Sequence, residues 1–255
     1  MILLDDLMSF LNTTMGDAQA AAKIDGYMPN GLQVRGRDEV RTVATGVSAS
    51  LRLFEEAAAL GADALIVHHG MNMPSNILFD DIFCQRLRYL WDHTMSLIGY
   101  HYLLDHHPEI GHNAQIIQAL GGRLAEPYPA DGWGWVGEIE EGGERDALLA
   151  RCTELFSQQG IHYPFGPERV RRMVVVSGAG APHPGEMDWL TKHRIDLFVT
   201  GEPREWNREL FREAGISFVA AGHYYTERIG IQALGDMLQR RLDVTVKFLD
   251  LPNSI

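Results

Sequence analysis

The sequence predicts an α/β protein made of two similar lobes, each with a mixed sheet and flanking helices. Three observations predict this class. Short apolar strands alternate with amphipathic helices, one segment near the middle interrupts the alternation, and the second half repeats polar positions of the first. At 255 residues, of which 45% are hydrophobic, the chain is long enough to bury a substantial core, so a disordered protein is excluded.

The first half begins with a helix and continues with alternating strands and helices. Apolar residues spaced three or four apart between Leu4 and Met15 predict an N-terminal helix that packs on one side. A strand is expected over 40–47, and Ser50 is placed to cap a helix that Gly61 ends. The later elements are a short strand after Pro29-Asn30-Gly31, a strand over 64–67, a helix around 83–91, a strand over 95–99, and a helix around 116–120 that stops at Gly121-Gly122.

Residues 126–170 interrupt the alternation of strands and helices. Pro127, Pro129 and the Gly-Trp-Gly-Trp run at 132–135 indicate a loop with a short antiparallel strand, and an amphipathic helix follows over 148–156. We therefore divide the chain into a first lobe (1–125), an inserted segment (126–170) and a second lobe (171–255), which closes with an alternating strand at 244–248.

The second half matches the first at polar as well as apolar positions. The stretch 99–105 aligns with 221–227, and both carry His-Tyr-x-x-acid after a short strand. The expected strand at 195–200 ends in Gly201-Glu202, where the first half has His68-His69. Short α/β units also resemble one another by chance, but the shared polar positions favour an internal duplication.

The apolar run 64–67 ends in two adjacent histidines, His68 and His69, which are followed by Gly70. Strand ends are where α/β sheets place their chemistry, and imidazole is a common metal ligand. Neighbouring residues on an extended strand point to opposite faces, so both can bind one ion only if the strand has ended; otherwise two ions are needed. Taken alone, the pair also fits two hydrogen-bonded structural histidines.

Two further pairs, His101 with Asp105 and His223 with Glu227, have the same four-residue spacing. That spacing places the two members on one face of a helix or of a strand. Each pair offers a neutral nitrogen and an anionic oxygen, which suit Zn, Fe, Mn, Co or Ni. With the strand-end histidines they would form a site for two ions between the lobes, bridged by the longer Glu227. The alternative for each pair is a local hydrogen bond.

Charge and composition exclude several classes of function. The formal net charge of −12 argues against a broad nucleic-acid surface. The N-terminal residues are acidic where a signal peptide needs bases, and no apolar run approaches the ~18 residues of a membrane span, so we expect a soluble cytoplasmic protein. The turn Ser177-Gly-Ala-Gly180 lacks the Lys-Ser/Thr of a phosphate-binding loop. Glu202 fits a substrate-positioning role and a turn position equally well.

Several motifs extend over nearly the whole chain: Pro29-Asn-Gly-Leu-Gln-Val34, Thr45-Gly-Val-Ser-Ala-Ser50, Ile66-Val-His-His-Gly70, Leu104-Asp-x-His-Pro-Glu109, Thr200-Gly-Glu202, Ala221-Gly-His-Tyr-x-Thr-Glu227 and Asp250-Leu-Pro-Asn253. Together they resemble the GTP cyclohydrolase I type 2-like family, also described as NGG-interacting-factor-like. The resemblance is greatest to its bacterial branch associated with radiation resistance.

The resemblance implies a two-lobed protein with a dinuclear metal site, assembled as a toroidal homohexamer. His101 matches a further site histidine, which either ligates or lies behind the ligands. His106 and His112 stand where the family often has Ala and Asn, a departure that bears on substrate preference. The metal ligands of the family fall on His68, His69, Asp105, His223 and Glu227.

These observations predict a hydrolase that acts on a nucleotide-like or cyclic amide small molecule through a metal-activated water, with His101 moving the proton. The alternative is a non-catalytic metal-binding regulatory or scaffold protein, which would fit the family's association with transcriptional and stress phenotypes. In either case the ligand histidines must be neutral, so metal affinity is expected to fall below roughly pH 6.5.

Overall fold

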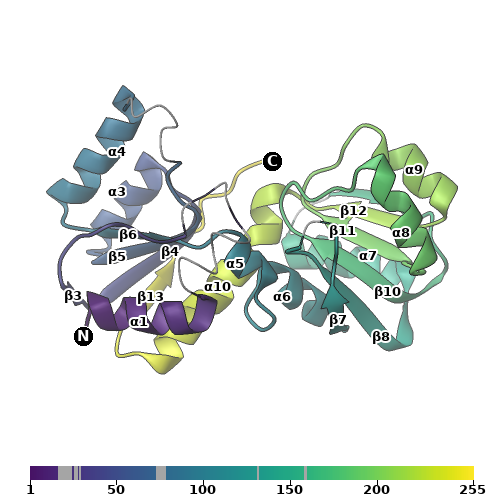
Figure 1. Ribbon diagram of the computed structural model, residues 1–255, viewed down its shortest axis with the longest axis horizontal. Coiled ribbons are helices and arrows are strands. Elements are labelled where there is room, and N and C mark those ends of the chain that lie inside the picture. The colour runs from purple at the N-terminus through teal and green to yellow at the C-terminus, as the bar shows by residue number, and fades with distance from the viewer. Residues whose placement is uncertain (17–24, 26–27, 29, 73–78, 131, 158–159) are drawn as a thin grey trace. The chain divides into compact units, whose positions relative to one another are not determined.

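The computed structural model describes residues 1–16, 25, 28, 30–72, 79–130, 132–157 and 160–255, so Pro29 of the predicted turn lies outside the described residues. The described residues form two compact units. Unit 1 consists of Met1–Leu104 and Ile231–Leu251, and unit 2 of Asp105–Gly230 and Pro252–Ile255. Each unit contains a sheet with helices on both faces (Figure 1). The division of the sequence at residues 125 and 170 stays a prediction.

The sheet of unit 1 has the strand order β13-β4-β5-β6-β2. The first four strands run parallel, and β2 pairs with β6 in the antiparallel sense at one edge. A separate two-stranded ribbon joins β1 (Ile2–Leu3) and β3 (Glu39–Val40). The strands of the larger sheet are β2 (Gly31–Val34), β4 (Thr42–Ser48), β5 (Ala64–His69), β6 (Ser96–Gly99) and β13 (Thr245–Phe248).

Helices cover both faces of this sheet. On one face lie α3 (Leu51–Ala59) and α4 (Asp81–Asp92); on the other lie α1 (Leu4–Met15) and the later part of α10 (His223–Arg241) (Figure 1). The Ser50 side chain accepts a hydrogen bond from the backbone N–H of Leu53, which confirms the predicted cap. Because both faces are covered, β4, β5 and β6 are buried along nearly their whole length rather than at alternate residues, as parallel strands usually are.

The sheet of unit 2 has the order β7-β8-β10-β11-β12-β9. Here β10, β11 and β12 are parallel, while β8 and β9 pair with them in the antiparallel sense. Three parallel strands followed by an antiparallel edge strand therefore occur in both units, which confirms the predicted repeat. The strands are β7 (Arg123–Pro127), β8 (Trp135–Glu144), β9 (Ile161–Tyr163), β10 (Arg169–Val176), β11 (Leu197–Thr200) and β12 (Ser217–Ala220).

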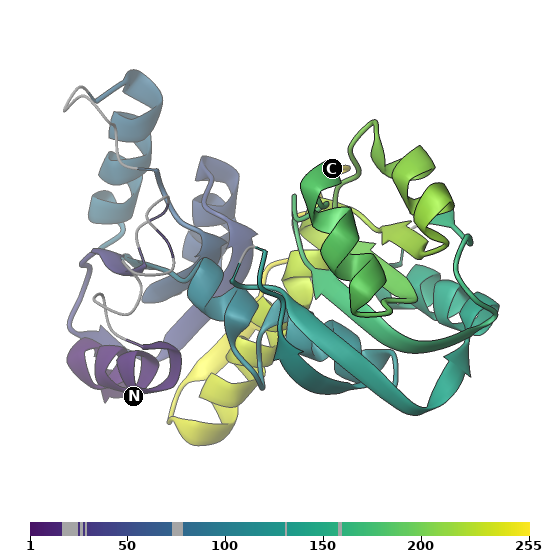
Figure 2. The ribbon, with the colours of Figure 1, turned by 45° about the vertical axis from the view of Figure 1, so that its right-hand side comes forward.

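The helices of unit 2 also pack on both faces of their sheet. The helices α6 (His112–Ala119) and α7 (Arg145–Phe156) pack on one face through a cluster that includes Ile117, Phe156 and Val199. On the other face, α8 (Met187–Lys192) and α9 (Asn207–Ala214) pack around Phe198 and Phe218 (Figure 2). Strand β8 is longer than the short strand expected in the inserted segment, because it pairs with β7 as well as with β10.

Two short helical elements and α10 complete the chain. A 3₁₀ turn, η1 (Pro184–Glu186), precedes α8. Helix α5 (Tyr102–His106) follows β6, and α10 follows β12; the boundary between the units falls within each of these two helices. Within the described part of the chain, no helix combines the length and the apolar character needed to cross a membrane.

Candidate metal-binding residues

Unit 1 brings His68, His69 and His101 together. His68 and His69 end β5, and His101 follows the neighbouring parallel strand β6, so all three reach the same edge of the sheet. Potential ligand atoms of the three lie within 4.8 Å of one another. The rings of His68 and His69 have their centroids 4.6 Å apart, so at this strand end the two side chains no longer point to opposite faces. Two ligand atoms on a tetrahedral zinc ion are about 3.4 Å apart, so the three rings would have to move closer together to bind one ion.

The first two imidazoles are held through Nδ1. His68 Nδ1 lies 3.0 Å from the backbone oxygen of Tyr100, and because a carbonyl only accepts, Nδ1 is the protonated nitrogen. His69 Nδ1 lies 2.9 Å from Ser48 Oγ, on the adjacent strand. Metal-binding histidines usually have their second ring nitrogen engaged in this way, so Nε2 is the candidate ligand atom of each ring.

The third imidazole is held by Asp25, which the sequence motifs did not reveal. The Asp25 Oδ2 accepts from His101 Nδ1 at 2.6 Å and also faces Asn30 Nδ2 at 3.3 Å and the Tyr102 N–H at 3.4 Å. Its Oδ1 accepts from the Met28 N–H at 3.0 Å. The Asp25 side chain has no exposed surface. No spacing rule links Asp25 to His101, so the sequence carried no signal for this contact.

Unit 2 brings His223 and Glu227 together on the first turns of α10. His223 Nε2 and Glu227 Oε1 are 2.9 Å apart, as the four-residue spacing predicts for a helix. Two ligand atoms in adjacent positions on an ion, each about 2.1 Å from it, are about 3 Å apart, so this pair has the spacing of ligands. On the other side of the ring, His223 Nδ1 contacts Glu202 Oε1, which gives Glu202 a role beyond a turn position.

The electrostatics of this pair favour a positive charge. Burial lowers the pKa of His223, but the hydrogen bonds and negative charges of Glu227 and Glu202 outweigh it and raise the pKa to about 9. An imidazole between two carboxylates therefore holds a proton at neutral pH in the metal-free protein. A divalent cation placed between Nε2 and Glu227 would supply the positive charge that this proton supplies.

The turn after β10 lies against both Asp105 and the His223–Glu227 pair. Gly178 has φ +62°, and a Cβ added there would lie 2.3 Å from Glu227 Oε1 and 3.0 Å from His223 Nε2. Its neighbour Ser177 donates from Oγ to Asp105 Oδ1 at 2.5 Å. This turn lacks a phosphate-binding motif, but its glycine is required because no side chain fits beside the pair.

His106 and His112, where the sequence departs from the family pattern, have packing roles in unit 2. The His106 ring stacks on Trp135 with the centroids 5.0 Å apart, and burial lowers its pKa. His112 Nδ1 accepts from the Gly230 N–H at 3.0 Å, which ties α6 to α10. The predicted site residues thus fall into two groups: His68, His69 and His101 in unit 1, and Asp105, His223 and Glu227 in unit 2.

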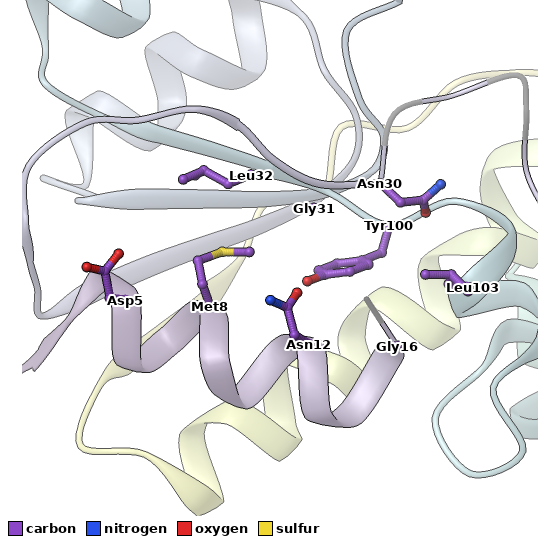
Figure 3. A pocket seen from close by; sticks show the side chains of 9 residues that line it. All are labelled: Asp5, Met8, Asn12, Gly16, Asn30, Gly31, Leu32, Tyr100 and Leu103. Atoms are coloured by element: carbon purple, nitrogen blue, oxygen red, sulfur yellow. The ribbon is translucent and has the colours of Figure 1, made fainter. Parts of the chain in front are cut away.

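A pocket of about 340 Å³ lies in unit 1 between α1 and the start of β2. Figure 3 shows the Tyr100 ring reaching into it toward Met8 and Asn12 of α1. Tyr100 is 1% exposed, and burial raises the pKa of its phenol, so the hydroxyl stays protonated. The pocket borders the histidine cluster through Tyr100, whose carbonyl holds His68, and Asn30, whose Oδ1 accepts from the His101 N–H.

Known proteins match the chain over nearly its whole length. Residues 2–254 match the family model described as Duf34/NIF3 (NGG1p interacting factor 3). The "GTP cyclohydrolase 1 type 2 homolog" of Escherichia coli (strain K12) is 38% identical over 243 residues, which cover 91% of this chain and 93% of the relative. Two solved structures have the same fold over 100% of both chains: protein ybgI, of unknown function, with 34% identity and a TM-score of 0.87, and TTHA1606 from Thermus thermophilus, with 29% identity and a TM-score of 0.83. The chain therefore belongs to the Duf34/NIF3 family, as its sequence motifs indicated.

Proposed function

We propose that the protein binds two divalent metal ions and hydrolyses a nucleotide-like or cyclic amide small molecule. The carrying observation is that another protein group holds each candidate ligand histidine, His68, His69 and His223, through Nδ1, as is usual for histidines that bind metal through Nε2. The Escherichia coli relative is named "GTP cyclohydrolase 1 type 2 homolog", which supports a nucleotide-like substrate with a ring to be opened. The proposed ligands are His68, His69, Asp105, His223 and Glu227.

The donor set fits this proposal. Imidazole nitrogens and carboxylate oxygens are the ligands of Zn, Fe, Mn, Co and Ni. The 2.9 Å separation of His223 Nε2 and Glu227 Oε1 supports adjacent positions on one ion. The near approach of Gly178 keeps other side chains away from that position. His68 and His69 of unit 1 and Asp105 of unit 2 supply the further donors that a second ion needs.

Bound divalent ions would acidify a water molecule and polarise the substrate. The residues of the chain position these partners and move the proton. In our proposal His101 accepts a proton at Nε2 and returns it to the leaving group, while the carboxylate of Asp25 stabilises the imidazolium that forms meanwhile. Burial of His101, which is 7% exposed, keeps bulk water from competing for that proton.

The test combines metal analysis with turnover. Elemental analysis of the purified protein is expected to give about two transition-metal ions per chain, and His68→Ala and Glu227→Gln are each expected to lower this content. His93→Ala, at an exposed histidine after α4, is the matched control and keeps the wild-type content. Metal-free wild type that takes up no divalent ion would refute the metal site.

The hydrolase part has its own readout. Metal-loaded wild type is assayed against a panel of nucleotides and cyclic amides, and we expect turnover that His68→Ala and Glu227→Gln abolish and His93→Ala retains. Metal binding without turnover on any member of the panel would refute the hydrolase and leave a metal-binding regulatory or scaffold protein.

We also propose that the chain assembles as a homohexamer. The proposal rests on the resemblance of the sequence motifs; Ile82 and Trp91 on α4 are 64% and 59% exposed and would be covered if subunits packed against this helix. Light scattering coupled to size exclusion is expected to give six times the chain mass. A monomer at micromolar concentration would refute this assembly.

A further inference from the structure

We propose that Asp25 and Glu202 are positioning residues that fix which nitrogen of His101 and His223 faces a metal ion. Each carboxylate holds Nδ1 of one histidine, so that Nε2 is the atom presented as ligand or base. The proposal rests on the proposed metal-binding function for its consequence, but the geometry on which it stands lies entirely within each unit.

Asp25 holds the His101 ring in one orientation. The carboxylate is an acceptor only, so at 2.6 Å the proton on His101 Nδ1 is the donor, and the neutral ring carries its lone pair on Nε2. A buried charge is costly unless hydrogen bonds compensate it. Here the backbone N–H of Met28 and the side chain of Asn30 supply two of them. The Asn30 Oδ1 also accepts from the His101 N–H at 2.8 Å, so the same residue fixes both the carboxylate and the backbone of the histidine.

In unit 2, Glu202 holds the His223 ring in one orientation. It follows β11, and its Oε1 contacts Nδ1 of His223, while Glu227 contacts Nε2 of the same ring. The two carboxylates occupy opposite nitrogens and cannot exchange roles without turning the ring. An ion can therefore take the place between Nε2 and Glu227 while Glu202 keeps its hold on Nδ1.

His68 and His69 differ from His101 and His223 in the charge of the group that holds Nδ1. Nδ1 of His68 meets a backbone carbonyl, and Nδ1 of His69 meets a hydroxyl, both of which are uncharged. A carboxylate partner makes an imidazole a stronger donor to metal and a stronger base than an uncharged partner does. Each unit thus contains one candidate histidine that a carboxylate strengthens, and each follows the parallel strand that pairs with the antiparallel edge strand, β6 with β2 in unit 1 and β12 with β9 in unit 2.

The first experiment reads the ring directly in the wild-type protein. Long-range ¹H–¹⁵N spectra of ¹⁵N-histidine-labelled, metal-free protein, assigned with His101→Gln, are expected to show neutral His101 protonated at Nδ1. After Zn²⁺ addition, Nε2 of His101 and His223 should shift to the values of coordinated or strongly bonded nitrogen while the Nδ1 protons remain. A His101 protonated at Nε2 in the metal-free protein would overturn the assignment to Asp25, and Zn²⁺ on Nδ1 of His223 would overturn that to Glu202.

The second experiment measures the consequence. Asp25→Asn and Glu202→Gln keep the size of each side chain and remove its charge. Asp25→Asn, which acts on the proton carrier His101, is expected to lower turnover of the panel substrate, and Glu202→Gln is expected to weaken Zn²⁺ binding in calorimetry, each about 10- to 100-fold. The exposed carboxylates Asp92 and Glu205 provide matched controls, Asp92→Asn and Glu205→Gln, whose turnover and affinity should equal those of the wild type. Wild-type turnover in Asp25→Asn together with wild-type Zn²⁺ affinity in Glu202→Gln overturns the proposal. A wild type that binds no Zn²⁺ refutes the metal site instead, while the metal-free spectrum still decides the role of Asp25.

Discussion

Replacing Gly178 with alanine tests whether His223 and Glu227 form a metal-binding pair. The substitution adds a single methyl group to the turn after β10, and the new Cβ would lie 2.3 Å from Glu227 Oε1 and 3.0 Å from His223 Nε2. An ordinary contact of this kind starts at 3.4 Å, so the carboxylate must retreat by about 1 Å. Because that oxygen ends a flexible side chain, it can move without disrupting the core.

The substitution is expected to lower both the folding stability and the metal affinity, for different reasons. Alanine at φ +62° costs about 1–2 kcal/mol of folding stability, as it does at any left-handed position. A metal ligand tolerates only about 0.2 Å of displacement, so a shift of this size removes Glu227 from the site. We expect Zn²⁺ affinity to fall on the order of 100-fold, as misplacing a positioned group by 1 Å typically does.

Calorimetric titration with Zn²⁺ and urea unfolding of the metal-free protein separate these costs. Gly61→Ala is the control, because Gly61 has φ +68° and an added Cβ there has no atom within 4 Å. Both variants should lose similar stability, and Gly178→Ala alone should lose metal affinity. Wild-type affinity in Gly178→Ala would refute the assignment of Glu227 Oε1 as a ligand.

Four further outcomes are expected. The pKa of His223 is raised to about 9, so its contribution to the stability of the metal-free protein is full below about pH 6.5 and is lost as the pH rises to 9. Urea unfolding measured from pH 6 to pH 10 should show the free energy of unfolding falling over this range. An equal fall in His223→Gln would contradict this. The same pKa predicts that Zn²⁺ affinity keeps rising up to about pH 9 rather than levelling off near 6.5, and calorimetry that shows a plateau at pH 7 would contradict it. Phe198→Ala should cost about 3–5 kcal/mol in urea unfolding, since the ring is fully buried among aromatic neighbours; a cost below about 1 kcal/mol would mean that the core refills the space. Ser50→Ala should lower the melting temperature through a loss of about 1 kcal/mol at the cap of α3, and an unchanged value would show that the cap is replaced.

Local patterns predicted the elements that they determine. The stripe from Leu4 to Met15, the cap at Ser50 and the apolar strand at 64–67 all appear where expected, because spacing and capping act within a few residues. The prediction was weakest in 126–170. There β8 gains its length from pairing with strands on both sides, and such pairing leaves little trace in a short stretch of sequence.

The candidate site divides in the same way. The four-residue spacing predicted the His223–Glu227 contact, whereas the sequence left open whether His68 and His69 could face one ion, and only the structure shows their rings 4.6 Å apart. The sequence patterns did not predict the contact of Asp25 with His101, which lies 76 residues later, or that of Glu202 with His223, which lies 21 residues later. Both carboxylates belong to loops, where no periodicity marks a residue as functional.

The sequence by itself determined the α/β class, the family and the candidate metal-binding residues, because apolar periodicity, turn residues and ligand chemistry follow from the order of the amino acids. Only the tertiary structure decided which nitrogen of each imidazole is held and why residue 178 has no side chain. Those properties depend on the separation in space of groups that are distant in sequence, and that separation is set by the packing of strands and loops rather than by any local pattern.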